Sequence, residues 1–159
     1  QRIIPADEGF LSPADGKVVQ IIDIEDKEMG SAKQISIFLS IFNIHSQRVP
    51  ISGKVISKQY NPGNFLIAFN HKASMDNEHT AVLFETENGK RYKIKQIAGF
   101  IARRILNYME PENLVQRGQR LGFIRFGSRV DIILPRDFQI DVSLGDIVQG
   151  NKTIIGQFQ

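Results

Sequence analysis

The sequence predicts a mainly β protein, a single-domain barrel or sandwich of many short strands with few short helices. Apolar, β-branched stretches are short throughout the 159 residues, as in strands rather than long helices. Gly, Pro and Asn separate these stretches at close intervals and mark turns. One of the separators is an Asn-Gly pair, a strong hairpin signal. Because the length suits one domain, we treat residues 1–159 as a single unit.

The first half of the chain contains two predicted strands and the turn that precedes them. Ser-Pro-Ala-Asp-Gly at 12–16 is a turn signature, since Pro fixes one backbone angle and Asp-Gly allows a tight reversal. Residues 17–24 are then rich in Val and Ile, and an acidic loop at 25–30 follows. Residues 34–44 carry apolar side chains with only single polar interruptions, which predicts a strand in the middle of the sheet.

The second half continues the alternation of strands and turns. A β-branched stretch follows Gly53, and residues 80–86 and 91–97 are the predicted arms of a hairpin around Asn88-Gly89. Residues 60–78 are predicted to form a long loop with one helical turn, and 97–105 are predicted to form a strand although a helix also fits. Strands at 121–126 and 129–134 flank Gly127-Ser128, and short strands at Val142, at 147–148 and at 153–155 end the chain.

Composition argues against several classes of function. The net charge of +3 comes from scattered Lys and Arg, whereas nucleic-acid modules concentrate their charge on one face, so we expect no nucleic-acid partner. Cysteine is absent, and the spacing of the three histidines matches no zinc signature; we expect no metal. No apolar run reaches the roughly 18 residues that span a bilayer. The sequence starts at Gln1, so an anchoring segment that precedes it remains compatible with these observations.

The Gly127-Ser128 pair has a chemical interpretation and a structural one. Glycine reaches backbone angles that other residues resist, and the serine hydroxyl lies next to the Gly127 carbonyl. Attack on that carbonyl would be an intramolecular acyl shift, which needs proximity, a base and a stabilised oxyanion. The structural alternative is an ordinary turn that leads into a strand.

Several segments in a fixed order carry a resemblance that favours the chemical interpretation. They are Ser-Pro-Ala-Asp-Gly-Lys-Val at 12–18, Phe-Leu-Ser through Gly at 38–53, Asn-Glu at 77–78, residues 97–105, Arg-Phe-Gly-Ser-Arg-Val-Asp-Ile-Ile-Leu-Pro at 125–135, and Gly-Asp-Ile-Val-Gln-Gly at 145–150. Together they resemble the phosphatidylserine decarboxylase family, and their spacing is most similar to its short bacterial and archaeal branch. The resemblance covers nearly the whole chain.

The resemblance implies that the protein makes its own cofactor. The Ser128 hydroxyl would attack the Gly127 carbonyl, and the chain would separate into a β chain of residues 1–127 and an α chain of residues 128–159. Ser128 would become a pyruvoyl group at the start of the α chain, without a metal. That group would form a Schiff base with phosphatidylserine and accept the electrons released with CO₂, which leaves phosphatidylethanolamine.

The family's residues for self-cleavage match this chain only in part. The resemblance implies a triad of Asp, His and Ser, in which Asp15 and Ser128 match directly. Longer members carry two histidines three residues apart, and these positions are His45 and Arg48 here. Since a guanidinium stays charged, Arg48 is not a base. We therefore expect His45 to serve both self-cleavage and decarboxylation unless this branch activates Ser128 differently.

The remaining expectations concern the substrate and its surroundings. Arg48, Arg103 and Arg104 are candidate ligands for the substrate carboxylate or phosphate. The implied partner is a phospholipid at a membrane surface, with the protein peripheral or anchored at the cell membrane and homo-oligomers possible. A substrate with ether-linked tails fits as well as a diacyl lipid. Two other readings are an inactive homologue and a non-catalytic carrier-like β module that uses Lys152.

Overall fold

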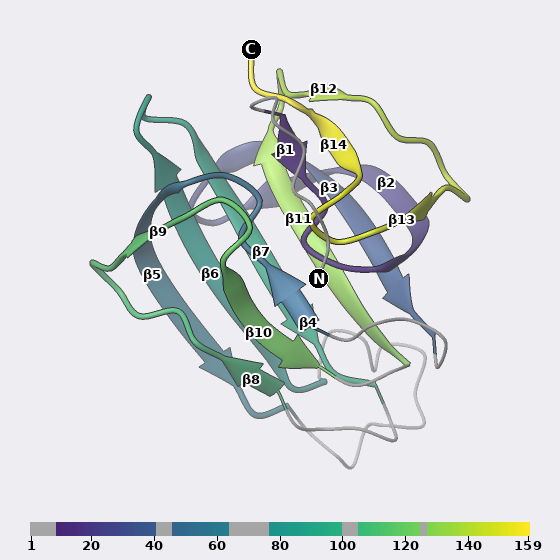
Figure 1. Cartoon of the computed structure of the whole chain (residues 1–159), viewed down its shortest axis with the longest axis horizontal. Coiled ribbons are helices and arrows are strands. Elements are labelled where there is room, and N and C mark those ends of the chain that lie inside the picture. Colours follow the sequence, from purple (N-terminus) through teal and green to yellow (C-terminus); the bar gives the residue numbers. More distant parts are fainter. Residues whose placement is uncertain (1–8, 41–45, 64–76, 100–104, 125–126) are drawn as a thin grey trace.

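The computed structural model describes residues 9–40, 46–63, 77–99, 105–124 and 127–159, which form antiparallel strands and turns with no helix in these ranges (Figure 1). The largest sheet has eight strands in the order β13-β2-β3-β11-β7-β6-β5-β9. Its strands are β2 (Gly16–Asp26), β3 (Gly30–Leu39), β5 (Gly53–Asn61), β6 (His79–Thr86), β7 (Arg91–Ile97), β9 (Leu114–Val115), β11 (Ser128–Pro135) and β13 (Ile147–Val148).

Two sheets of three short strands complete the fold. One has the order β1-β14-β12 and the other the order β4-β10-β8. Their strands are β1 (Phe10–Leu11), β14 (Ile154–Gln157), β12 (Gln139–Ile140), β4 (Ser46–Arg48), β10 (Arg120–Ile124) and β8 (Ile105–Asn107). Figure 1 shows β4 and β10 lying in front of the large sheet, with β1 and β14 near its upper end.

The main predictions about the fold are confirmed. The protein is mainly β, and β3 lies inside the large sheet between β2 and β11. The predicted hairpin is β6 and β7, with Gly89 at a φ of 78° in its turn, a left-handed angle that favours glycine. Of the three short strands expected near the C-terminus, the last two are β13 and β14, and the first is β12, which ends at Ile140, before the expected Val142.

Several predicted boundaries shift. β3 ends at Leu39, and β5 extends to Asn61, into the segment predicted to be a loop. β7 ends at Ile97 and β8 begins at Ile105, so the interior of the ambiguous 97–105 segment falls largely outside the described residues. The remainder of the predicted 60–78 loop is also described only at its ends.

The core lies between the large sheet and the two small sheets. Alternate side chains of the large sheet, such as Ile35 and Ile37, share one buried cluster with Leu121 of β10 and Ile155 of β14, as expected when successive side chains of a strand point to opposite faces. The Tyr92 hydroxyl donates a 2.7 Å hydrogen bond to the Ile51 carbonyl, and burial raises the pKa of Tyr92. The core thereby holds the small sheets against the large one.

Candidate active site

Gly127 and Ser128 lie at the start of β11, between the ends of β3 and β7. Ser128 pairs with Leu39 of β3 and is only 1% exposed. The Gly127 amide donates a 2.7 Å hydrogen bond to the Leu39 carbonyl. Gly127 has a φ of 76°, which a residue with a side chain adopts only at a cost. Gly127 is therefore the exposed turn residue that leads into β11, and Ser128 is the first, buried residue of an internal strand ladder.

The ladder brings Asp15 to the same end of the sheet. Lys17 of β2 pairs with Phe38 of β3, one residue before the partner of Ser128. Asp15 lies two residues before Lys17, and Gly127 directly precedes Ser128, so both lie just beyond the ends of these two ladders. Residues far apart in the sequence thus meet at one end of β3 (Figure 1).

Asp15 is held by a backbone group from the C-terminal part of the chain. Its side chain is nearly buried, and its Oδ1 atom accepts a 2.7 Å hydrogen bond from the amide of Gly150. In the same turn, the Ser12 hydroxyl donates to the Ala14 carbonyl at 2.7 Å, and the Asn151 amide donates to the Ser12 carbonyl at 3.2 Å. Hydrogen bonds therefore join the 12–16 turn to the end of the Gly-Asp-Ile-Val-Gln-Gly segment and the residue after it.

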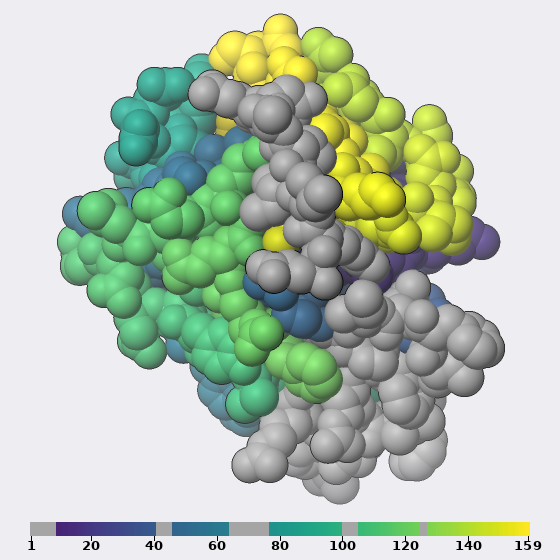
Figure 2. Space-filling view, viewed as in Figure 1, coloured from purple at the N-terminus to yellow at the C-terminus, as the bar shows by residue number. Residues whose placement is uncertain are grey.

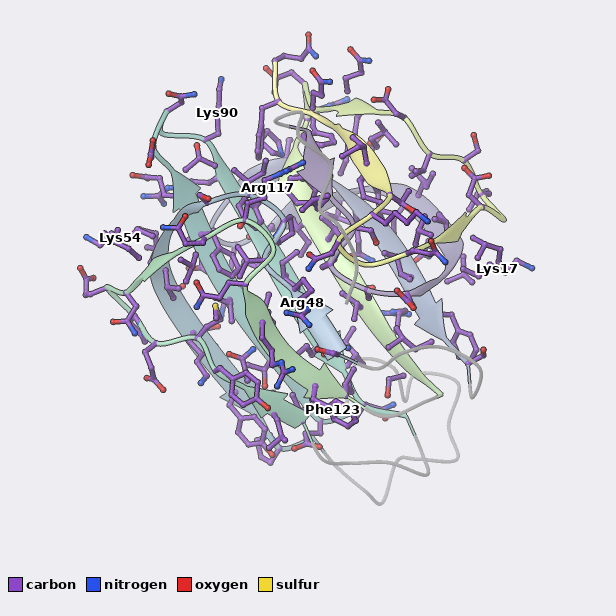
Figure 3. The ribbon with its side chains drawn as sticks, viewed as in Figure 1. Lys17, Arg48, Lys54, Lys90, Arg117 and Phe123 are labelled. Atoms are coloured by element: carbon purple, nitrogen blue, oxygen red, sulfur yellow. The ribbon has the colours of Figure 1, made fainter. Side chains whose placement is uncertain are left out.

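Arg48 lies on β4, beside the turn that carries Asp15. Its backbone amide donates a 2.8 Å hydrogen bond to the Pro13 carbonyl. Its guanidinium is half-buried and makes a long 3.5 Å hydrogen bond to the Gly118 carbonyl (Figure 3). The position is compatible with binding of an anion near Asp15, and that function stays a prediction.

Three other predicted site residues, His45, Arg103 and Arg104, lie outside the described residues. The described residues next to these segments belong to the small sheet of β4, β10 and β8. Ser46 of β4 pairs with Phe123, and Ile105 of β8 pairs with Ile124. Within the part of the chain that is described, no three His, Cys, Asp or Glu side chains gather as metal ligands would.

Comparison with known proteins identifies the family. Residues 1–156 match the family described as phosphatidylserine decarboxylase. The chain is 44% identical over 160 residues to the phosphatidylserine decarboxylase proenzyme of Desulfotalea psychrophila, covering 99% of this chain and 75% of the relative. It is 45% identical over 161 residues to the proenzyme of Burkholderia cenocepacia, covering 100% and 75%. The chain belongs to the phosphatidylserine decarboxylase family. The family inferred from the ordered motifs is thereby confirmed.

A further part of the site in this phosphatidylserine decarboxylase family member was not predicted. The Asn77 side-chain amide donates to the Ala98 carbonyl, and the Ala98 amide donates to the Glu78 carbonyl, both at 2.9 Å. Asn77 and Glu78 contributed to the family resemblance without a function attached to them. The structure shows that they fix the backbone where β7 ends, next to the start of β11.

A buried amide network was also missed by sequence reasoning. Gln96 of β7 donates to the Gln47 side chain of β4 at 2.8 Å and accepts from the Asn107 side chain of β8 at 2.7 Å. These bonds join the large sheet to the small one and fix β4 and β8 against β7. The three residues are 49 and 11 positions apart in sequence, and no local pattern links them.

The surface near the site carries exposed apolar side chains. Leu106 and Phe123 pair across β8 and β10 and are exposed, as is Tyr108 (Figure 3 labels Phe123). Figure 2 shows that the segment 105–124, in green, and the C-terminal residues, in yellow, lie on the same face of the molecule. Among the described residues, no helix is long and apolar enough to cross a bilayer.

Proposed function

We propose that the protein is a phosphatidylserine decarboxylase proenzyme that cuts itself between Gly127 and Ser128 and then decarboxylates phosphatidylserine. The family membership supports the activity. One structural observation carries the cleavage site: a buried serine follows a left-handed glycine at the start of an internal strand. The hydroxyl therefore adjoins the carbonyl of a residue whose amide is bound to the end of β3, which favours an intramolecular attack.

The proposed self-cleavage balances without an oxidant or a metal. The Ser128 Oγ atom bonds to the Gly127 carbonyl carbon, the C–N bond breaks, and the nitrogen takes a proton, which gives an ester. Removal of the Ser128 Cα proton then breaks the Cβ–Oγ bond and leaves the Gly127 carboxylate and a dehydroalanine. Tautomerisation and addition of one water release ammonia and leave a pyruvoyl group at position 128.

Asp15 and His45 are proposed to move the protons. An imidazole that takes the Ser128 hydroxyl proton becomes a cation, and a nearby carboxylate orients and stabilises it. The buried position of Asp15, fixed by the Gly150 amide, supports the carboxylate's part in this arrangement. His45 immediately precedes β4 in the chain. Arg48 is proposed to bind the carboxylate or phosphate of the substrate, with Arg103 and Arg104 as further candidates.

The residues around Ser128 fit the group that would be made from it. A pyruvoyl carbonyl supplies an acceptor for the electrons that remain on the substrate's α-carbon when CO₂ leaves. The burial of Ser128 and the packing of the start of β11 against β3 would exclude water from that carbon and favour loss of CO₂ over side reactions.

The fold also supports the proposal that the two chains stay bound to each other after the cleavage. In the cut protein, β11 would remain paired with β3 on one side and β7 on the other. Asp15 of the β chain and Gly150 of the α chain already share a buried hydrogen bond. The exposed Leu106 and Phe123 support an approach of the site to a lipid surface, where the phospholipid substrate resides.

Intact mass spectrometry tests the proposal. Purified protein should resolve into fragments 1–127 and 128–159, and the second should begin with a pyruvoyl group, which cyanoborohydride would link to phosphatidylserine. Ser128→Ala should remain one chain, and His45→Ala should accumulate uncut precursor. A folded wild-type protein that stays uncut would refute self-processing, and normal maturation of His45→Ala would refute that residue's function as the base.

A further inference from the structure

The backbone of Gly99 lies directly against the carbonyl group of Gly127. A methyl group built on Gly99 would be 2.2 Å from the Gly127 carbonyl oxygen and 2.8 Å from its carbon. Both distances are far shorter than the roughly 3.5 Å at which nonbonded atoms attract one another. Glycine, which has no side chain, therefore leaves room for the carbonyl group of the peptide bond that the proposed self-cleavage breaks.

The neighbouring backbone limits how far a side chain at position 99 could be accommodated. On one side, Asn77 and Glu78 bind both the carbonyl and the amide of Ala98, at 2.9 Å each. On the other side, the Gly127 amide is bound to the Leu39 carbonyl at 2.7 Å. With Ala98 and the Gly127 amide both bound, the simplest relief of the contact is rotation of the Gly127 carbonyl.

We propose that Gly99 is a positioning residue for self-processing, an inference that rests on the proposed cleavage between Gly127 and Ser128. The missing side chain lets the Gly127 carbonyl keep the orientation that the Ser128 hydroxyl attacks. It also leaves space for the oxygen to move as the carbon changes from planar to tetrahedral. A displacement of about 1 Å at a reacting atom can slow a reaction by roughly 100-fold.

Gly53 provides a matched control elsewhere in the same sheet. A methyl group on Gly53 would lie 2.3 Å from the Glu85 carbonyl oxygen, which is nearly the same steric conflict. Gly53 belongs to β5, and two strands, β6 and β7, separate β5 from β11. The two glycines therefore differ mainly in which carbonyl group they lie against. Only the carbonyl next to Gly99 belongs to the peptide bond that is proposed to be cut.

The test compares Gly99→Ala with Gly53→Ala in the full-length protein. The conversion of precursor to two chains is followed by gel electrophoresis and mass spectrometry. Gly99→Ala should mature about 100-fold more slowly than wild type, while Gly53→Ala should mature at nearly the wild-type rate. Hydroxylamine, which captures esters as hydroxamates, should release fragment 1–127 from wild-type precursor and not from Gly99→Ala over the same time.

A second set of variants separates positioning from folding. Both glycine changes are placed in the Ser128→Ala protein, which is not processed, and their unfolding midpoints are compared. Similar midpoints with different maturation rates support the inference. It is overturned if Gly99→Ala matures normally, if hydroxylamine cuts it at the wild-type rate, if both glycine variants lose maturation equally, or if Gly99→Ala alone prevents folding. If the wild type itself stays uncut, the proposed function fails instead.

Discussion

Two buried polar regions of the large sheet differ in what holds them. Under the tip of the β2–β3 hairpin, the Lys93 ammonium of β7 contacts the Asp26 carboxylate at 2.9 Å and the Glu28 carboxylate at 2.8 Å. At the start of β11, the Asp15 carboxylate accepts a hydrogen bond from the Gly150 amide, and the Gly127 amide donates one to the Leu39 carbonyl.

The comparison separates a polar cluster that serves the fold from the groups that are proposed to serve the chemistry. Lys93, at 3% exposure, has two carboxylates beside it, so its charge is balanced and its function is structural. The start of β11 is fixed in part by backbone groups, since the Gly127 amide donates to the Leu39 carbonyl, and it carries its own ion pair between Arg129 and Asp131 at 2.9 Å. Burial and a charged side chain therefore do not by themselves mark a reactive site in this protein.

The largest effect is expected for Asp15→Asn, which tests whether the β11 region is the reactive one. Asparagine can still accept the Gly150 hydrogen bond but cannot stabilise a cationic base, so self-processing should slow by about 100-fold or more. A time course of chain cleavage measures this rate. Asp26→Asn, the matching change in the ion cluster, should mature normally. Equal maturation of Asp15→Asn and wild type would remove Asp15 from the mechanism.

An intermediate effect is expected for Lys93→Met, which tests the structural assignment of the ion cluster. The largely buried Asp26 carboxylate and the partly exposed Glu28 carboxylate would lose their common cation, so the free energy of unfolding should fall by about 1–3 kcal/mol. Urea unfolding of the variant in the Ser128→Ala protein measures this, since that protein stays a single chain. Adding Asp26→Asn and Glu28→Gln should restore most of the stability. A large loss that persists in this triple variant would contradict the ion-pair explanation.

The smallest effect is expected on the free energy of unfolding when the pH is lowered. Burial raises the pKa of Asp26, but the hydrogen bonds from Lys93 and from the Glu28 and Met29 amides, with the Lys93 charge, outweigh burial and lower it. The hydrogen bond from Lys93 is the main reason that the pKa of Glu28 is lowered. Carboxylates whose folded pKa is depressed contribute stability above their unfolded pKa values and lose it as pH falls through the folded ones.

Stability should therefore decline below about pH 4.5, where unfolded carboxylates begin to take up protons. Urea unfolding at several pH values in the Ser128→Ala protein measures this decline. Adding Asp26→Asn and Glu28→Gln together should flatten it. An unchanged pH dependence in that variant would assign the acid sensitivity to other groups and weaken the contrast between the two regions.

Much of the fold could be predicted because its signals are local. The Asn88-Gly89 turn and its two β-branched arms are adjacent in sequence, and they form the hairpin of β6 and β7. Strand ends were less predictable, since apolar character continues past Leu39 and past Ile97. The positions of such ends depend on which neighbouring strand supplies hydrogen bonds, and the sequence does not state this.

For the candidate site, the sequence suggested residue types, and only part of their geometry could be predicted from it. The order of motifs predicted Gly127, Ser128 and Asp15, and the structure brings these three to one end of β3. The Gly150 amide on Asp15 and the close approach of Gly99 to the Gly127 carbonyl were not predictable. A backbone donor and an absent side chain leave no signature in a single sequence.

The sequence by itself determined the family, the β class and the Gly127-Ser128 pair, because these depend on residue types in a fixed order. The tertiary structure decided that Ser128 is buried inside a strand ladder, that Asp15 is held from the C-terminal segment, and that Gly99 faces the Gly127 carbonyl. Each of these features depends on contacts between segments that are far apart along the chain, and such contacts form only when the strands pair and the sheets pack together.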